Sequence, residues 1–249
     1  PEGFSLTPPH DILGKKTGSF LPKGPNSQVL LDMMIRSFNI LKKHPVNIGR
    51  INRGLKPANS IWLWGEGKKP CVPPFSLKYN LKGSVICAVD LIKGLGISSG
   101  LKIVHVEGAT GNFHTNYKGK AEAALRELDN GRDFVYIHVE APDECGHRCE
   151  IHNKIKSIEL IDEQVVGRLL EGLKSFSRYR MLILPDHATP LSLRTHVSDP
   201  VPFLLYDSSH EEKLAAKVRP FDEVQAKNTG VFVEHGHELM DYLTGKKAF

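Results

Sequence analysis

Five acidic and imidazole side chains follow or precede predicted strands of this chain. They are Asp143 and His147 after one strand, Asp186 and His187 after another, and His196 just before a third. Carboxylates and neutral imidazoles are ligands that Mn²⁺, Zn²⁺ and similar divalent ions accept. Two ions about 4 Å apart need both ligand types from several chain segments. The pattern therefore predicts a two-metal site, with five ligands delivered to one rim of a sheet.

Simpler interpretations exist for each part of this pattern. An Asp-His pair after a strand is often a helix cap beside a surface imidazole, and a single D-x-x-x-H is a weak signal. Cys145 and Cys149 flank His147 at a spacing that also permits a structural zinc site, but no second Cys pair supports one. Convergence of three segments favours the two-metal interpretation, because clustered His and Asp residues are a recognised site signature.

The rest of the sequence predicts elements that would position these residues. Apolar spacing and punctuation by Gly and Pro predict helices and strands in alternation. The helices are expected at 28–43, 85–95, 119–128, 151–175 and 237–243, and the strands at 60–64, 102–106, 134–139, 180–184, 202–206 and 230–236. Such alternation predicts an α/β fold with a mainly parallel sheet sandwiched by helices. In such sheets ligands gather beyond the carboxyl ends of the strands.

Composition limits the classes of function. The 249 residues are 40% hydrophobic and 24% charged, with a net charge of +5 and no block of Lys and Arg, so a basic cleft is favoured over a nucleic-acid partner. No apolar run approaches the roughly 20 residues of a membrane helix, and no leader precedes the first loop, so no membrane partner and a cytoplasmic location are expected. Four cysteines in a chain of this length are expected to be reduced thiols.

Longer segments carry a resemblance to a known family. The stretches HVEAPDECGH, LPDHATP and RTHVSDPVPFLLY resemble the metal-binding blocks of cofactor-independent phosphoglycerate mutases, in the alkaline phosphatase superfamily. TPPHDILGK, HPVNIGRINRGLKPANSIWLWGEG and EGATGNFHTNYKGKAEAAL resemble the archaeal-type branch. The resemblance implies part of a substrate-binding cap domain at 1–58 and a metal-binding, alkaline-phosphatase-like core at 59–249 that lacks its N-terminal segment.

The resemblance also implies roles for individual residues. Asp143, His147 and His196 would bind one metal ion, and Asp186 with His187 the second. Mn²⁺ is the expected metal, with Zn²⁺, Co²⁺ or Mg²⁺ as alternatives, and 2,3-bisphosphoglycerate is not expected as a cofactor. The nucleophilic Ser of the family, and a further Asp, have no counterpart here and are expected upstream. No catalytic nucleophile is therefore assigned within this chain.

The implied reaction is the interconversion of 3-phosphoglycerate and 2-phosphoglycerate through a phosphoserine intermediate, an isomerase step of glycolysis and gluconeogenesis. The candidates for substrate binding are cationic or imidazole residues, three in predicted loops and one within the helix predicted at 85–95, namely His10, Arg53, Lys56 and Lys93. The alternatives are another phosphomutase or phosphatase of the same superfamily, or an inactive metal-binding fragment. The sequence leaves the oligomeric state open.

Overall fold

The structure is a computed structural model that describes residues 3–210 and 219–249 and divides into two compact units. The first unit ends at Pro70 and the second begins at Cys71, later than the boundary at residue 58 expected from the sequence. The segment after residue 58 stays with the first unit through hydrogen bonds. Trp62 Nε1 donates to the Thr7 carbonyl at 2.8 Å, and the Leu6 amide donates to Glu66 Oε1 at 3.1 Å.

Two helices dominate the first unit. Its elements are the 3₁₀ turns η1 (Pro9–Ile12) and η2 (Thr17–Phe20) and the helices α1 (Ser27–Leu41) and α2 (Pro45–Asn52). The predicted helix at 28–43 is confirmed as α1, and Pro45 starts the next helix at its first turn, where a missing N–H is harmless. The strand predicted at 60–64 is wrong. This segment forms no ladder; Ser60 Oγ donates to the Met34 carbonyl at 2.9 Å instead.

The second unit is built on two small sheets. Their strands are β1 (Gly83–Ile86), β2 (Lys102–Val104), β3 (Phe134–Ile137), β4 (Arg180–Ile183) and β5 (Leu204–Asp207). The order β2-β1-β3 is parallel throughout, while β4 and β5 form an antiparallel pair. The predicted strands near 102, 134, 180 and 202 are confirmed. The α/β fold with a mainly parallel sheet is also confirmed.

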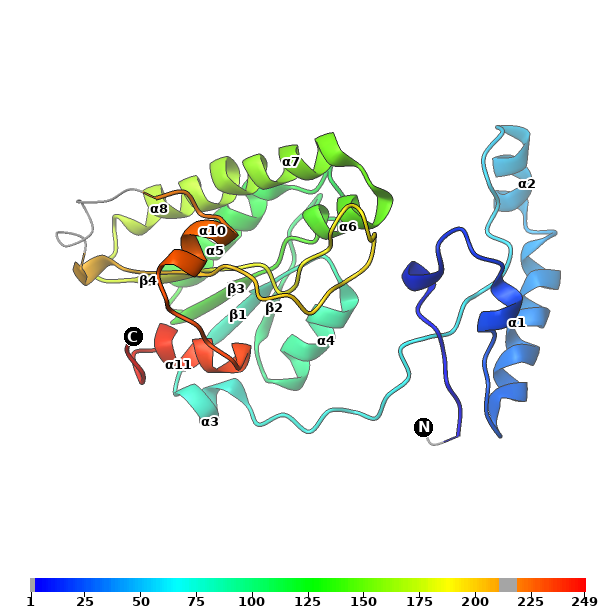
Figure 1. The fold of residues 1–249 in the computed structure, drawn as a ribbon, viewed down its shortest axis with the longest axis horizontal. Coiled ribbons are helices and arrows are strands. Elements are labelled where there is room, and N and C mark those ends of the chain that lie inside the picture. The colour runs from blue at the N-terminus through cyan, green and yellow to red at the C-terminus, as the bar shows by residue number, and fades with distance from the viewer. Residues whose placement is uncertain (1–2, 211–218) are drawn as a thin grey trace. The chain divides into compact units, whose positions relative to one another are not determined.

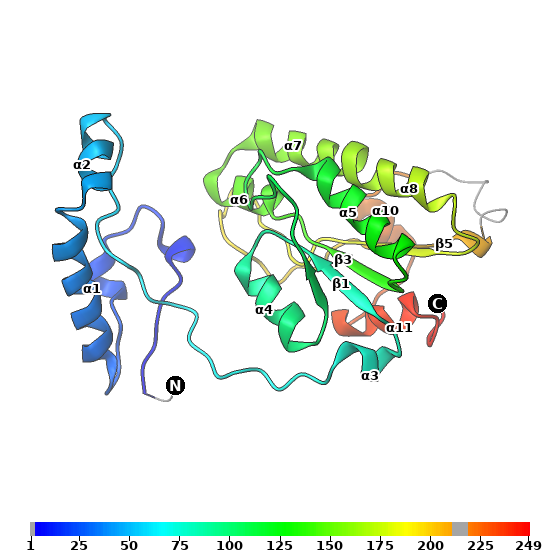
Figure 2. The same cartoon turned by 180° about the vertical axis from the view of Figure 1, so that it is seen from behind.

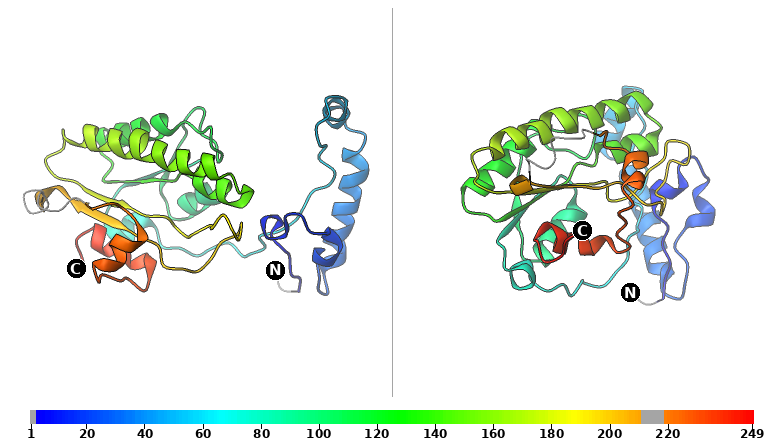
Figure 3. Two further views of the ribbon diagram at one scale, coloured as in Figure 1. Left: turned by 45° about the horizontal axis from the view of Figure 1, so that its top comes forward. Right: turned by 60° about the vertical axis from the view of Figure 1, so that its left-hand side comes forward.

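Helices cover both faces of the parallel sheet (Figures 1 and 2). Among the described residues of this unit, the helices are α3 (Phe75–Tyr79), α4 (Asp90–Ser98), α5 (Tyr117–Asp129), α6 (Ala141–Arg148), α7 (Ile151–Leu160), α8 (Gly167–Leu173), α10 (Glu223–Asn228) and α11 (Leu239–Leu243). The short elements η3 (Ile161–Val166, π), η4 (Ser208–His210) and η5 (Gly236–Glu238) lie between or beside them. α5 packs on β1 and β3, α4 packs on β1 and β2, and α7 runs through η3 into α8 above the sheet (Figure 3).

The core lies between the sheets and this helical layer. Ile86 at the end of β1 and Ala121 on α5 are fully buried, and Leu169 of α8 belongs to the same cluster. The helix predicted at 85–95 is wrong in its first residues, because the buried Val85 and Ile86 form the central strand and the helix begins only at Asp90. Side chains buried on both faces of a central strand give a continuous apolar run, which periodicity alone does not distinguish from a helix.

The tail differs from its prediction. The strand expected at 230–236 is absent from the structure of that segment, which contains only irregular backbone and the start of η5. The helix expected at 237–243 is confirmed in shortened form as η5 and α11. None of the helices among the described residues combines the length and apolar character needed to cross a membrane.

A buried carboxylate ties α5 to the sheet. Glu127, with a side chain only 8% exposed, accepts from Ser84 Oγ at 2.6 Å and from Lys102 Nζ at 2.7 Å, and Arg132 Nε lies 3.7 Å away. Burial acts to raise the pKa of Glu127, but the hydrogen bonds from Lys102 and Ser84 outweigh it and hold the pKa below its ordinary value.

Glu127→Ala is expected to lower the free energy of unfolding by about 3 kcal/mol, because it leaves the buried Ser84 hydroxyl and a cation without their acceptor. Urea unfolding followed by circular dichroism measures the loss. Asp129→Ala, at an exposed position of the same helix, is the control and should change stability by less than about 0.5 kcal/mol. Equal stability of the two variants would contradict the anchoring role.

Candidate metal centre

The helix α6 presents two of the predicted metal ligands on one face. Pro142 stands in its first turn, and Asp143 and His147 are separated by one helical turn, which places their side chains one above the other. His147 Nε2 lies 3.3 Å from Asp143 Oδ2. The His147 ring is almost fully buried, whereas the Asp143 carboxylate is partly exposed. This helix was not predicted from the sequence, which indicated only that a strand precedes these residues.

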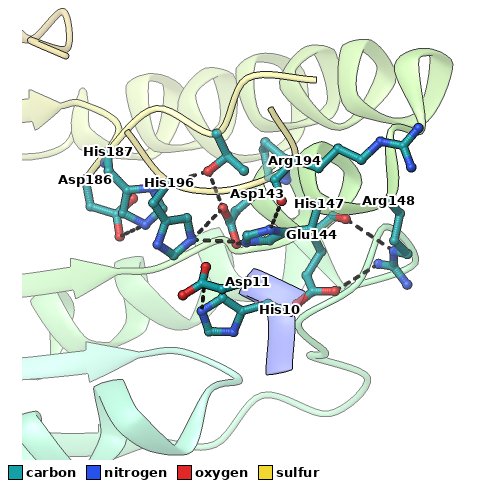
Figure 4. Close-up of polar contacts among 12 residues, drawn as sticks. His10, Asp11, Asp143, Glu144, His147, Arg148, Asp186, His187, Arg194 and His196 are labelled. Carbon is teal, nitrogen blue, oxygen red and sulfur yellow. Dashed lines mark hydrogen bonds and ion pairs between the residues drawn. The ribbon is translucent and has the colours of Figure 1, made fainter. Parts of the chain in front are cut away.

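The other predicted ligands come from the segments after β4. Asp186 and His187 follow that strand closely, and an isolated antiparallel bridge between Ala188 and Val197 brings the segment of His196 alongside. The ring centroids of His187 and His196 are 3.8 Å apart. His187 Nε2 lies 3.6 Å from Asp186 Oδ2. The structure therefore places Asp186 and His187 beside His196, as Figure 4 shows.

Contacts between α6 and these segments join the two groups. His196 Nε2 lies 3.3 Å from Asp143 Oδ1 and 3.0 Å from His147 Nε2. Ligand atoms of Asp143, His187 and His196 all lie within 4.8 Å of one another. All five residues chosen from the sequence thus gather in one cluster (Figure 4).

Hydrogen bonding defines the state of the His147 ring. Its Nδ1 lies 2.9 Å from the carbonyl oxygen of Arg194, which can only accept, so Nδ1 carries the hydrogen. In the neutral ring Nε2 then offers a lone pair, and it faces the Asp143 carboxylate and a second imidazole nitrogen. Acceptors that converge in this way need a proton or a cation between them. A metal-ligating histidine typically donates its other N–H to a carbonyl in this manner.

This donor set fits a divalent ion. Carboxylate oxygen with imidazole nitrogen suits Mn²⁺ and Zn²⁺, and the alternative thiol site finds less support. Cys145 is fully buried in α6, and the clusters with metal-binding spacing among residues 3–210 and 219–249 contain only carboxylates and imidazoles. The zinc interpretation based on Cys145 and Cys149 is therefore not supported by the described side chains.

Thr189 belongs to the centre, although sequence reasoning did not select it. The side chain is buried, its hydroxyl donates to Asp143 Oδ1, and it lies 3.3 Å from Nδ1 of His187. The residue lies in the LPDHATP segment, so its proximity in sequence to the predicted ligands was the available signal. A hydroxyl at this point links the carboxylate of α6 to the segment that carries His187.

Acidic residues surround the N-terminus of α6. Glu140, Asp143 and Glu144 place carboxylate oxygens within 4.8 Å of one another. Burial, reinforced by the charges of Glu144 and Asp143, raises the pKa of Glu140 to about 7. The cluster is thus electrostatically strained when no cation is bound, which is consistent with a site for positive ions.

The raised pKa predicts a pH dependence. Because folded Glu140 binds its proton more tightly than the unfolded chain, its effect on stability is most favourable below pH 4.5 and is lost as the pH rises from 4.5 to 7. The free energy of unfolding should therefore fall less between pH 5 and pH 8 in Glu140→Gln than in the unmodified chain. After allowance for solvent screening, the difference is expected to be about 1 kcal/mol. Urea unfolding in EDTA at pH 5 and pH 8 measures it, with the exposed Glu171→Gln as control. The prediction would be contradicted if the free energy of unfolding changed between pH 5 and pH 8 by the same amount in Glu140→Gln and in the unmodified chain.

Three of the predicted substrate residues lie in the first unit. His10 lies in η1, with its Nε2 3.9 Å from Asp11 Oδ1 and its ring 5.2 Å from that of Trp64. Arg53 caps α2, with Nε donating to the Gly49 carbonyl at 3.0 Å. Lys56 is exposed, and its carbonyl oxygen accepts a hydrogen bond from Arg50 Nε at 2.8 Å. Their roles in substrate binding stay predictions.

The fourth, Lys93, lies in the second unit on α4. Its Nζ lies 2.9 Å from Asp90 Oδ1, and this hydrogen bond raises the pKa of Lys93. Lys93 lines a cavity of about 230 Å³ beyond the ends of β1 and β2, together with Cys87 and His105. A cation at the carboxyl end of a parallel sheet is suitably placed for an anionic ligand.

Comparison with known protein families places this cluster in context. The model of the metalloenzyme superfamily matches residues 27–247. The chain belongs to the metalloenzyme superfamily. A second family model, described as 2,3-bisphosphoglycerate-independent phosphoglycerate mutase, matches residues 2–47. Membership of this superfamily supports the use of divalent metal ions and confirms the fold expected from the sequence.

Curated relatives of this metalloenzyme share one description. The chain is 48% identical to the 2,3-bisphosphoglycerate-independent phosphoglycerate mutase of Methanothrix thermoacetophila, over 95% of this chain and 60% of the relative. It is 46% identical to the probable mutase of the same kind from Geobacter sulfurreducens, over 97% of this chain and 60% of the relative. The resemblance found in the sequence is confirmed. The chain spans about 60% of the length of these relatives.

Solved structures agree on the fold. A protein of Pyrococcus horikoshii matches with a TM-score of 0.67 at 26% identity, over 90% of this chain and 58% of the other. The cofactor-independent phosphoglycerate mutase of Thermoplasma acidophilum matches with a TM-score of 0.51 at 21% identity, over the whole chain and 60% of the other. The second likeness, at this identity, concerns the fold alone.

Proposed function

We propose that this chain is the metal-binding part of a cofactor-independent phosphoglycerate mutase, which interconverts 3-phosphoglycerate and 2-phosphoglycerate. The observation that carries the proposal is the convergence of Asp143, His147 and His196, with contacts of 3.0 to 3.3 Å, beside Asp186 and His187. The descriptions of the relatives supply the reaction and the substrate.

The metal ligands divide into two groups under this proposal. Asp143, His147 and His196 would hold one ion, and Asp186 with His187 would hold part of the shell of a second. Bound ions would neutralise phosphoryl oxygens and lower the pKa of an attacking hydroxyl. The residues of the chain do the positioning: the Arg194 carbonyl fixes the His147 tautomer, and the Thr189 hydroxyl orients the Asp143 carboxylate.

The nucleophilic serine and a further metal ligand would come from a segment that corresponds to the part of the relatives outside the matched region. We assign the first unit to the substrate-binding cap and the second unit to the metal-binding core. In the cap His10, Arg53 and Lys56 would contact phosphate or carboxylate groups, and Lys93 would do so in the core. Mn²⁺ as the native metal, a cytoplasmic location and a place in glycolysis and gluconeogenesis complete the proposal.

A transfer assay tests the function. The chain is joined to the part of the Methanothrix relative that it does not span, and conversion of 3-phosphoglycerate to 2-phosphoglycerate is measured with Mn²⁺ and without 2,3-bisphosphoglycerate. Turnover by the joined protein is expected, together with its loss when EDTA removes the metal. The joined protein with Asp129→Ala serves as the control for a change at an exposed site and should retain turnover.

The same assay separates the alternatives. Release of inorganic phosphate from several phosphate esters, without formation of 2-phosphoglycerate, would support a phosphatase and contradict the mutase. Metal binding by a folded joined protein that neither transfers nor hydrolyses phosphate would support a metal-binding fragment instead.

A further inference from the structure

A lysine outside the ligand set connects the two segments that deliver the metal ligands. Lys154 lies on α7, which packs against α6. Its Nζ lies 3.2 Å from the carbonyl oxygen of Pro142 and 2.9 Å from that of Thr189. Pro142 directly precedes Asp143 in α6, and Thr189 donates its hydroxyl to the Asp143 carboxylate.

The chemistry of the group suits this position. An ammonium has three donors and no acceptor, so one Nζ can satisfy two carbonyl oxygens from different segments. Pro142 stands in the first turn of α6, and its carbonyl has an additional partner in Lys154 from the neighbouring helix.

Close packing at the same point leaves little freedom. A Cβ built on Gly146 would lie 2.7 Å from the Thr189 carbonyl oxygen and 2.9 Å from Lys154 Nζ. The helix α6, the segment after β4 and the lysine therefore meet where only glycine fits. A change in any of these three is therefore expected to shift Asp143 relative to His187 and His196.

We propose that Lys154 is a positioning residue of the metal centre, whose Nζ clamps the Pro142 and Thr189 carbonyls and so holds the Asp143 carboxylate in register with the histidines of the other segments. The inference rests on the proposed metal centre. It concerns a residue that contacts no ligand atom through a hydrogen bond and acts only through its neighbours.

The test is Mn²⁺ titration of this chain by calorimetry, with Lys154→Met as the main variant. Loss of a supporting residue typically weakens metal binding by about 10- to 100-fold, and this range is expected for Lys154→Met. Lys154→Arg, which retains the charge and several donors, should recover most of the affinity. Lys156→Met is the matched control on the same helix, because Lys156 is exposed and its ammonium lies 3.0 Å from the exposed carboxylate of Glu159. It should change the affinity by less than about twofold.

Denaturant unfolding of each variant separates positioning from stability. A folded Lys154→Met variant with the affinity of the unmodified chain overturns the role of Lys154 and leaves the metal centre intact. If Lys154→Met does not fold, Lys154→Gln, whose side chain remains polar, carries the same expected loss. Failure of the unmodified chain to bind Mn²⁺ overturns the metal centre, and the inference with it.

Discussion

Asp143→Ala is expected to weaken Mn²⁺ binding by the chain more than 100-fold, beyond the effect of removing a supporting residue. The reason is the central position of this carboxylate. Its two oxygens face His147 and His196, each at 3.3 Å, and its Oδ1 also accepts from Thr189. Removing it takes away negative charge and leaves two imidazoles facing each other at 3.0 Å. Mn²⁺ titration by calorimetry, on protein shown by circular dichroism to be folded, measures the loss.

Asp143→Asn is the conservative companion of this change, since the amide keeps the shape but loses the charge. Its affinity should fall between those of Asp143→Ala and the unmodified chain. Asp129→Ala, which removes an exposed carboxylate from α5, controls for the change in net charge and should bind normally. Undiminished Mn²⁺ binding by Asp143→Ala would show that the ion binds elsewhere and would contradict the assignment of the centre.

Side-chain chemistry at strand ends was the part of the site that the sequence could predict. Asp186 and His187 lie just beyond β4, as a strand followed by polar residues indicates. The sequence did not show that β4 pairs antiparallel with β5 outside the parallel sheet. The resemblance predicts His196 as a metal ligand, but its approach to α6 could not be derived from the residues themselves, because it depends on the bridge between Ala188 and Val197. That contact joins two irregular segments and has no periodic signal in the sequence.

Two elements were misjudged from the sequence, each for its own physical reason. Val85 and Ile86 were expected in a helix, but burial on all sides in the central strand gives the same apolar run as a buried helix. The segment around Trp62 is rich in β-branched and aromatic residues, yet it forms no strand. Trp62 donates to the loop carbonyl of Thr7, and Ser60 donates to the Met34 carbonyl in α1. At Val85 and Ile86 the apolar run was ambiguous, whereas at Trp62 tertiary contacts overrode local strand propensity.

Supporting residues were hidden for a different reason. Lys154 reads as one more polar position of a helix, and only the structure shows its Nζ between two carbonyls. Thr189 likewise resembles a loop residue until its hydroxyl is placed against Asp143. Such roles depend on distance in space between α6, α7 and the segment after β4. Spacing along the chain carries no information about them.

Gly146 shows how closely these three elements approach, and it gives the second large expected effect. Gly146→Ala would place a methyl group 2.7 Å from the Thr189 carbonyl oxygen and 3.0 Å from Thr189 Cγ2, both inside normal contact distance. Because the carbonyl is backbone, α6 must move away from the segment that carries His187. Overpacking of this kind is expected to lower the free energy of unfolding by about 2–3 kcal/mol.

Mn²⁺ binding by Gly146→Ala should also weaken, since the same shift separates Asp143 from His196. Mn²⁺ titration measures the loss of affinity, and urea unfolding in EDTA measures the loss of stability. Gly94→Ala is the matched control, because Gly94 lies within α4 and a Cβ there meets no atom within 4 Å. Alanine should stabilise that helix by about 0.5–1 kcal/mol and leave Mn²⁺ affinity unchanged. Opposite changes in the free energy of unfolding for the two substitutions would identify the close backbone approach at Gly146 as the cause of the destabilisation. If Gly146→Ala matched Gly94→Ala in stability and affinity, α6 would have room to move without disturbing the ligands, and the metal centre would not depend on this contact.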